Sequence, residues 1–269
     1  MTQQQINTAE KRERRKRRAR IRVVWNIVRY IALFVVALYT AGYLSAFQFY
    51  KINQKRAISG INYYTPYCYM MDDVDITAGK LTDEAISRLP IEWQKHIRKY
   101  WKFVVSSDFI SSDEIAKLMQ QNGTGSVFGQ TDDNSKIIHL RYTSGMDADK
   151  YIYVCLHELG HAISRETGGS FYAKEYIKLY NTYRESYAMV TNYVEKQYVT
   201  LDEAELFATI IADTIINQEK MSADNNALFL YADSILAKTP PQNLFTQAHC
   251  GVTNLLRNAQ YRIQQKKAN

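Results

Sequence analysis

An uncharged apolar run near the start of the chain constrains its fold more than any other feature. Tyr30 to Tyr50 contains no Asp, Glu, Lys or Arg, and about 20 apolar residues in a helix suffice to cross a bilayer. In the wider stretch 23–50 the one charge is Arg29, near the end where its side chain can reach the headgroups. We therefore expect residues 23–50 to be a transmembrane signal anchor in contact with the lipid bilayer.

The net charge of +7 is concentrated directly before this run. Residues 1–22 hold nine Lys and Arg against Glu10 and Glu13, and the rest of the chain carries 25 basic and 25 acidic groups. Because basic flanks stay inside, we expect 1–22 to be a cytoplasmic tail and the chain from about Lys51 to be extracytoplasmic. A neutral body offers no broad phosphate-binding face, so no nucleic-acid partner is expected. A cleaved signal peptide and a DNA-binding arm are the alternatives.

The remainder has the composition of a folded domain, with 46% hydrophobic residues and 4 Pro. We expect a juxtamembrane linker over 51–80 and one domain over 81–269, with a strand at 102–106 and a hairpin over 127–143 whose turn lies at 129–135. Helices are expected over 82–101 with a break allowed at Pro90, and over 113–121, 151–165, 172–193, 201–218, 225–237 and 254–265. A small N-terminal sheet followed by helices predicts a mostly helical α+β fold.

The cysteines are few enough to exclude a disulfide-stapled scaffold. Cys68 and Cys250 lie at opposite ends of the exported domain and can pair in an oxidising compartment. Cys155 stands in an apolar helical run, where we expect it to be buried.

Two of the five histidines fall in His157-Glu158-Leu159-Gly160-His161, the HExxH pattern. The flanking residues are apolar and free of Pro, so we expect a largely buried helix. The i, i+4 spacing places both imidazoles on one helix face, where they can ligate one Zn²⁺ ion. Glu158 lies about 100° round the helix, from which it can act as general base on the water that the zinc activates. Gly160 leaves space beside the motif.

A catalytic zinc needs a third protein ligand. Ser164 and Thr167 stand where the extended motif has Gly and a third His, so the ligand must come from elsewhere. The acidic candidates are Glu166, Glu175, Glu185, Glu195, Asp202, Glu203, Glu205 and Asp213. Glu205 shares a helix face with Ala208 and Ala212, which lets another helix or a metal approach closely. Glu203 instead faces Leu206, Phe207 and Ile210, so Glu205 is the better ligand.

The segments His157–Ile163 and Glu203–Ala208 resemble the anthrax lethal factor family of zinc metallopeptidases, which includes the secreted Pro-Pro endopeptidases. The resemblance spans Tyr151 to Ile216 and implies a zincin-like fold. It also implies that His157, His161 and Glu205 bind zinc, that Glu158 is the base, and that Tyr198, seven residues before the glutamate, stabilises the oxyanion.

The chain departs from that family at one position. Lethal factor has an acid one turn after its glutamate ligand, whereas this chain has Thr209. The hydrogen-bond partner of the zinc ligands is therefore unassigned, with Asp213 as a candidate. By the same analogy, the strand 136–143 would line the cleft and pair with extended substrate. We expect His139 to be an ordinary strand residue and Glu166 to be solvated.

Together these features predict a membrane-anchored zinc metalloendopeptidase, a hydrolase that acts on a protein or peptide substrate outside the cytoplasm. The alternative is a catalytically inactive, membrane-tethered metal-binding module. Such a module would bind the metal without Glu158-dependent cleavage.

Overall fold

The computed structural model describes residues 3–44, 49–107, 128–187, 202–216 and 226–268. The chain divides into two compact units, Met1–Ala41 and Gly42–Asn269. The helix expected over 113–121 and the residues Tyr198 and Glu195 lie outside the described part.

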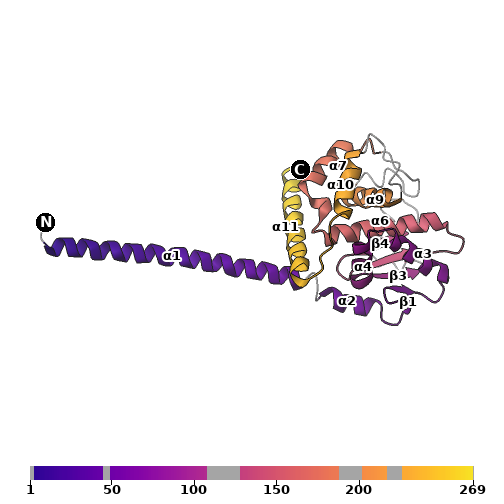
Figure 1. The fold of residues 1–269 in the computed structure, drawn as a ribbon, viewed down its shortest axis with the longest axis horizontal. Coiled ribbons are helices and arrows are strands. Elements are labelled where there is room, and N and C mark those ends of the chain that lie inside the picture. Colours follow the sequence, from indigo (N-terminus) through magenta and orange to yellow (C-terminus); the bar gives the residue numbers. More distant parts are fainter. Residues whose placement is uncertain (1–2, 45–48, 108–127, 188–201, 217–225, 269) are drawn as a thin grey trace. The chain divides into compact units, whose positions relative to one another are not determined.

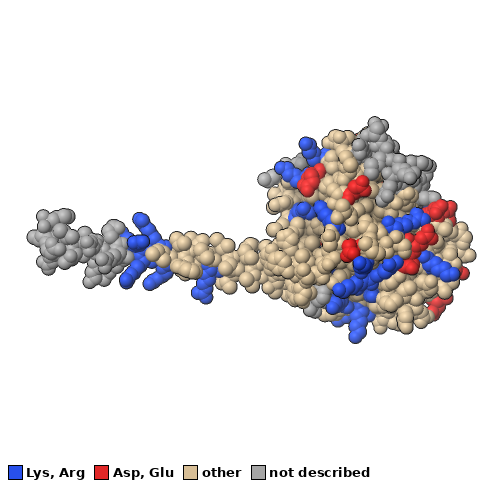
Figure 2. Space-filling model, viewed as in Figure 1, with Lys and Arg blue, Asp and Glu red and all other residues tan. Residues whose placement is uncertain are grey.

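The helix α1 (Gln3–Tyr43) makes up nearly all of the first unit. Its segment Lys16–Tyr43 is long and apolar enough to cross a membrane by length and composition, a test that a signal sequence also passes. Figure 2 shows basic side chains at the start of the described part of this helix and then mostly uncharged surface. The helix ends before the expected boundary at residue 50, and Tyr50 is instead buried in the core of the second unit.

The segment 51–80, which we expected to be a linker, belongs to the folded second unit. It supplies most of α2 (Phe49–Ala57), the strands β1 (Asn62–Thr65) and β2 (Cys68–Met70), and the start of α3 (Ile76–Ser87). Cys68 and Ala78 are fully buried. The sequence did not reveal these strands because three or four residues are too few to show a period-two pattern.

The described residues form one mixed sheet with the order β1-β2-β3-β5-β4. β3 (Lys102–Ser106) confirms the expected strand, and it runs parallel to both β2 and β5 (Ile137–Arg141). β4 (Gly129–Asp132) pairs antiparallel with β5, which confirms a hairpin but places its turn at 133–136. β5 lies between two strands, so its backbone has no side left for substrate. Among the described residues β4 is the edge strand beside it.

The later elements are helical, as expected. They are α6 (Ala148–Glu166), a short 3₁₀ turn (Ser170–Tyr172), α7 (Lys174–Tyr183), α9 (Glu203–Ile216), α10 (Asn226–Leu236) and α11 (Leu244–Ala268). The helix expected to begin at Thr82 begins earlier, because the Asp75 carboxylate caps α3 by accepting from the Thr77 N–H at 2.7 Å. Thr82 is buried inside that helix. Pro90 separates α3 from α4 (Ile91–Tyr100), which confirms the break.

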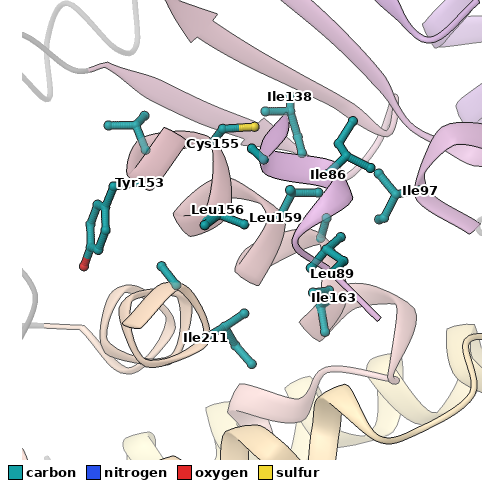
Figure 3. Packing of buried hydrophobic residues seen from close by; sticks show 14 of the residues in the cluster. Ile86, Leu89, Ile97, Ile138, Tyr153, Cys155, Leu156, Leu159, Ile163 and Ile211 are labelled. Carbon is teal, nitrogen blue, oxygen red and sulfur yellow. The ribbon is translucent and has the colours of Figure 1, made fainter. Parts of the chain in front are cut away.

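The helix α6 is the centre of the second unit and lies between the sheet and the helices α9, α10 and α7 (Figure 1). In Figure 3 its residues Leu156, Leu159 and Ile163 pack between Ile86 of α3 and Ile211 of α9. The side chains of α6 are buried on nearly every face. Polar groups on this helix must therefore find partners inside the protein.

The pairing that Cys68 and Cys250 could have formed is not present in the structure. Cys68, Cys155 and Cys250 are free thiols, and Cys155 is fully buried as expected.

Glu166, which we expected to be solvated, is buried at the C-terminal end of α6. It accepts hydrogen bonds from Lys136 Nζ at 2.6 Å and Trp101 Nε1 at 3.0 Å, and it lies 3.0 Å from His96 Nε2. Burial raises its pKa, but the Lys136 and His96 interactions outweigh burial and hold the pKa well below the usual carboxyl range. The network joins α6 to α4 and to the turn before β5.

We predict that Glu166→Gln destabilises the fold by about 3–5 kcal/mol, because it leaves the buried Lys136 ammonium without a counter-charge. Denaturant unfolding of the full chain in detergent measures this loss. Folding lowers the Glu166 pKa, so its contribution is present at neutral pH and is lost as the pH falls below the usual carboxyl range. The exposed Glu185→Gln is the control, and an equal effect of both substitutions would contradict the prediction.

Candidate metal centre

Three candidate ligands converge where α6 meets α9. Donor atoms of His157, His161 and Glu205 all lie within 4.8 Å of one another. The Glu205 carboxylate oxygens lie 3.1 Å from His157 Nε2 and 3.6 Å from His161 Nε2, and the two rings have centroids 5.0 Å apart. The cluster can hold a metal ion. Its three members are the ligands predicted from the sequence, the two histidines by their spacing and Glu205 by its alanine neighbours.

The approach of the two helices depends on small residues. A Cβ on Gly160 would lie 2.7 Å from the Ala208 Cα and 2.9 Å from its carbonyl oxygen. Any side chain at Gly160 would therefore push α9 away from α6. Because Ala208 lies one turn after Glu205, the same contact brings the carboxylate to the two imidazoles.

The cluster is open to solvent on one side. The exposed fraction of the side chain is 8% for His157, but 18% for His161 and 22% for Glu205. An ion bound here would be covered by protein at His157 and partly accessible to solvent at His161 and Glu205.

The described rival ligands have other roles. The Asp202 carboxylate accepts from the Ala204 N–H at 2.6 Å at the start of α9. The Asp213 carboxylate accepts from the Tyr187 hydroxyl, and the Glu203 carboxylate is not part of the cluster. Glu175, Glu185 and His139 are not among the clustered groups either.

Thr209 supplies the partner that the sequence left unassigned. Its hydroxyl lies 3.2 Å from His157 Nδ1. A metal on Nε2 requires the ring proton on Nδ1, where Thr209 Oγ1 can accept it. The residue that departs from the lethal factor pattern thus stands where it can orient His157, and the expected candidate Asp213 bonds elsewhere.

Glu158 is buried beside the cluster and is held by the edge strand. The Thr131 hydroxyl donates to Glu158 Oε2 at 2.7 Å and lies 3.0 Å from its backbone oxygen. A Cβ on Gly129 would lie 2.6 Å from Glu158 Oε1, so a side chain there would displace the carboxylate. Sequence reasoning missed Thr131 and Gly129, because a pairing between a strand and a helix 27 residues apart leaves no local pattern.

The environment of Glu158 changes its acidity. Burial raises the pKa of the carboxyl group to about 7, and the Glu205 charge adds to that effect, while His161 and the Thr131 hydrogen bond oppose it. A carboxyl group with this pKa exchanges protons readily near neutral pH.

Comparison with known proteins adds no family assignment. No protein-family model matches the chain, and no curated protein matches it.

We predict that Thr209→Val weakens metal binding about 10–100-fold, because His157 loses the partner that orients its ring. Chelator competition on the full chain measures the affinity. Thr214→Val is the matched control, since Thr214 is also buried on α9 but bonds to the Ile210 carbonyl. Equal metal affinities of the two variants would show that Thr209 does not support the metal ligands.

Proposed function

We propose that this protein is a membrane-anchored, zinc-dependent endopeptidase. The observation that carries the proposal is the convergence of His157, His161 and Glu205 next to the buried Glu158. Two imidazoles and one carboxylate are a donor set that Zn²⁺ favours in catalytic sites. The resemblance of these residues to the anthrax lethal factor family supports the same assignment and a zincin-like fold.

The chemistry divides between the ion and the side chains. A bound Zn²⁺ would supply Lewis-acid polarisation and lower the pKa of water in the site to about 7. Glu158 takes a proton from the water while the water oxygen attacks the carbonyl carbon of the substrate. Glu158 then delivers that proton to the leaving amine. Thr131 keeps the Glu158 carboxylate in one orientation throughout, because its hydroxyl bonds to Oε2. Tyr198 stabilises the oxyanion, a role that rests on the resemblance alone.

The substrate binds along the edge of the sheet. In the described part of the chain, no strand covers the outer side of β4. An extended peptide can add to such an edge through backbone hydrogen bonds. This edge is adjacent to the motif helix, because Thr131 of β4 contacts Glu158 directly. β4 therefore takes the role that the sequence had suggested for the strand at 136–143.

The apolar part of α1 anchors the enzyme. Its length and composition suit a span, and the basic residues before it favour a cytoplasmic N-terminus and an extracytoplasmic catalytic domain.

We predict that Glu158→Gln lowers peptide cleavage about 10²–10⁴-fold without loss of bound zinc, because the amide cannot accept the water proton. Full-length protein in detergent, tested on a peptide library alongside a zinc assay, gives both values. Equal cleavage by wild type and variant would contradict the peptidase mechanism. Zinc bound by a wild type that cleaves nothing would favour the inactive metal-binding module.

We predict that Glu205→Gln lowers zinc affinity at least about 10-fold, whereas Glu203→Gln leaves it unchanged. The two glutamates lie two residues apart on α9, but Glu205 alone of the two contacts the histidines in the structure. Chelator competition compares them directly. The reverse ranking would overturn the ligand assignment.

A further inference from the structure

The second unit begins in contact with α11. A Cβ on Gly42 would lie 2.6 Å from Val252 Cγ2 and 2.9 Å from the Ala248 carbonyl oxygen, so a side chain at Gly42 does not fit. The apolar segment of α1 ends at Tyr43, the next residue. Gly42, one residue before the end of that segment, therefore packs against α11.

An apolar stripe runs along α11 from this contact. Val252, Leu256, Ala259 and Ile263 recur at helical spacing and share one face. Val252 is buried, whereas Leu256 is 49% exposed and Ile263 is 55% exposed. At about 1.5 Å per residue the stripe extends roughly 16 Å from Val252 to Ile263. Leu255 lies beside it and is 46% exposed. The exposed apolar surface thus begins next to the contact between Gly42 and Val252.

The charges around the stripe have one sign. α11 contains no Asp or Glu but has Arg257, Arg262, Lys266 and Lys267, and the chain has no acidic residue between Arg14 and Met71. This favours contact with an anionic surface.

The helix α2 adds to the basic surface. It binds the domain through Gln54, whose side-chain amide donates to the carbonyl oxygens of Tyr100 and Lys136, while Lys51, Lys55 and Arg56 are exposed. α2 begins at Phe49, six residues after Tyr43. Six residues span at most about 20 Å, so α2 begins near the end of the span.

We propose that the exposed faces of α11 and α2 together lie on the surface of an anionic lipid bilayer. The surface consists of Leu255, Leu256, Ala259 and Ile263 of α11 and Lys51, Lys55 and Arg56 of α2. The apolar side chains enter the boundary between headgroups and acyl chains, and the basic groups bind lipid phosphates. This inference rests on the anchoring part of the proposed function and is independent of the catalytic part.

The test places a tryptophan reporter on the stripe of the full-length chain. Ile263→Trp is made in a Trp25→Phe background, because Trp25 lies in the apolar segment and Trp93 and Trp101 are fully buried. The protein is reconstituted in vesicles of anionic and zwitterionic lipid that contain brominated acyl chains, which quench nearby indole fluorescence. Ile76→Trp is the matched control, because Ile76 is also 55% exposed and α3 lies on the other side of the unit from α11 (Figure 1).

We expect a several-fold larger loss of fluorescence for Ile263→Trp than for Ile76→Trp. Lys51→Gln with Lys55→Gln reduces that loss in anionic vesicles. Lys80→Gln with Arg88→Gln does not, because Lys80 lies on α3 and Arg88 directly after its last residue. Equal quenching of the two reporters, at a low or a high level, would overturn the proposal.

Two other results overturn it as well. Energy transfer between reporters on different molecules, without bromide quenching, would show that a second copy covers α11. Release of the protein from vesicles by alkaline carbonate would show that α1 does not span the bilayer, and this inference would then fail as well. Neither result bears on Glu158-dependent cleavage, so a failure of the membrane contact and a failure of the peptidase assignment are distinguishable.

Discussion

The candidate site depends on how closely two helices approach. Gly160 and Ala208 meet backbone to backbone, and this contact sets the distance from the Glu205 carboxylate to the imidazoles of α6. One added methylene at Gly160 would separate the helices by more than the few tenths of an ångström that ligand distances tolerate. Selection for the ligands would therefore extend to residues that never touch the ion, and the small side chains of α9 belong to the site as much as its glutamate does.

The hairpin of β4 and β5 contacts the helix α6 at two positions, Glu158 and Glu166. Thr131 of β4 bonds to Glu158, and Lys136, just before β5, bonds to Glu166 two turns later. A buried ion pair contributes little net stability, but it specifies one arrangement strongly because the alternatives leave a charge unpaired. The hairpin therefore fixes the rotation of α6 about its own axis, which decides where Glu158 and the two imidazoles point.

Much of this arrangement could be predicted from the sequence, and the rest could not for identifiable reasons. The helix that carries His157 was predictable because an apolar run surrounds a fixed spacing, and Glu205 was favoured over Glu203 because alanines flank it. The roles of Glu166, Thr131 and Thr209 were not predictable. Each depends on a partner from a distant segment, and a buried carboxylate at a helix end looks like a solvated one until its partners are known. The strands between 62 and 70 were missed because they are too short to show alternation.

The edge strand β4 has two duties that cannot vary independently. Its Thr131 side chain bonds to the Glu158 carboxylate, and in the proposed peptidase its outer backbone, which no described strand covers, would bind the substrate. A peptide that orders β4 by pairing with its edge would also order the Glu158 carboxylate through Thr131. By linkage, an ordered Glu158 carboxylate would favour binding of the peptide. Peptides long enough to pair with the whole length of β4 would then be bound more tightly and cleaved faster than short peptides. Length discrimination of this kind would arise without any dedicated recognition pocket.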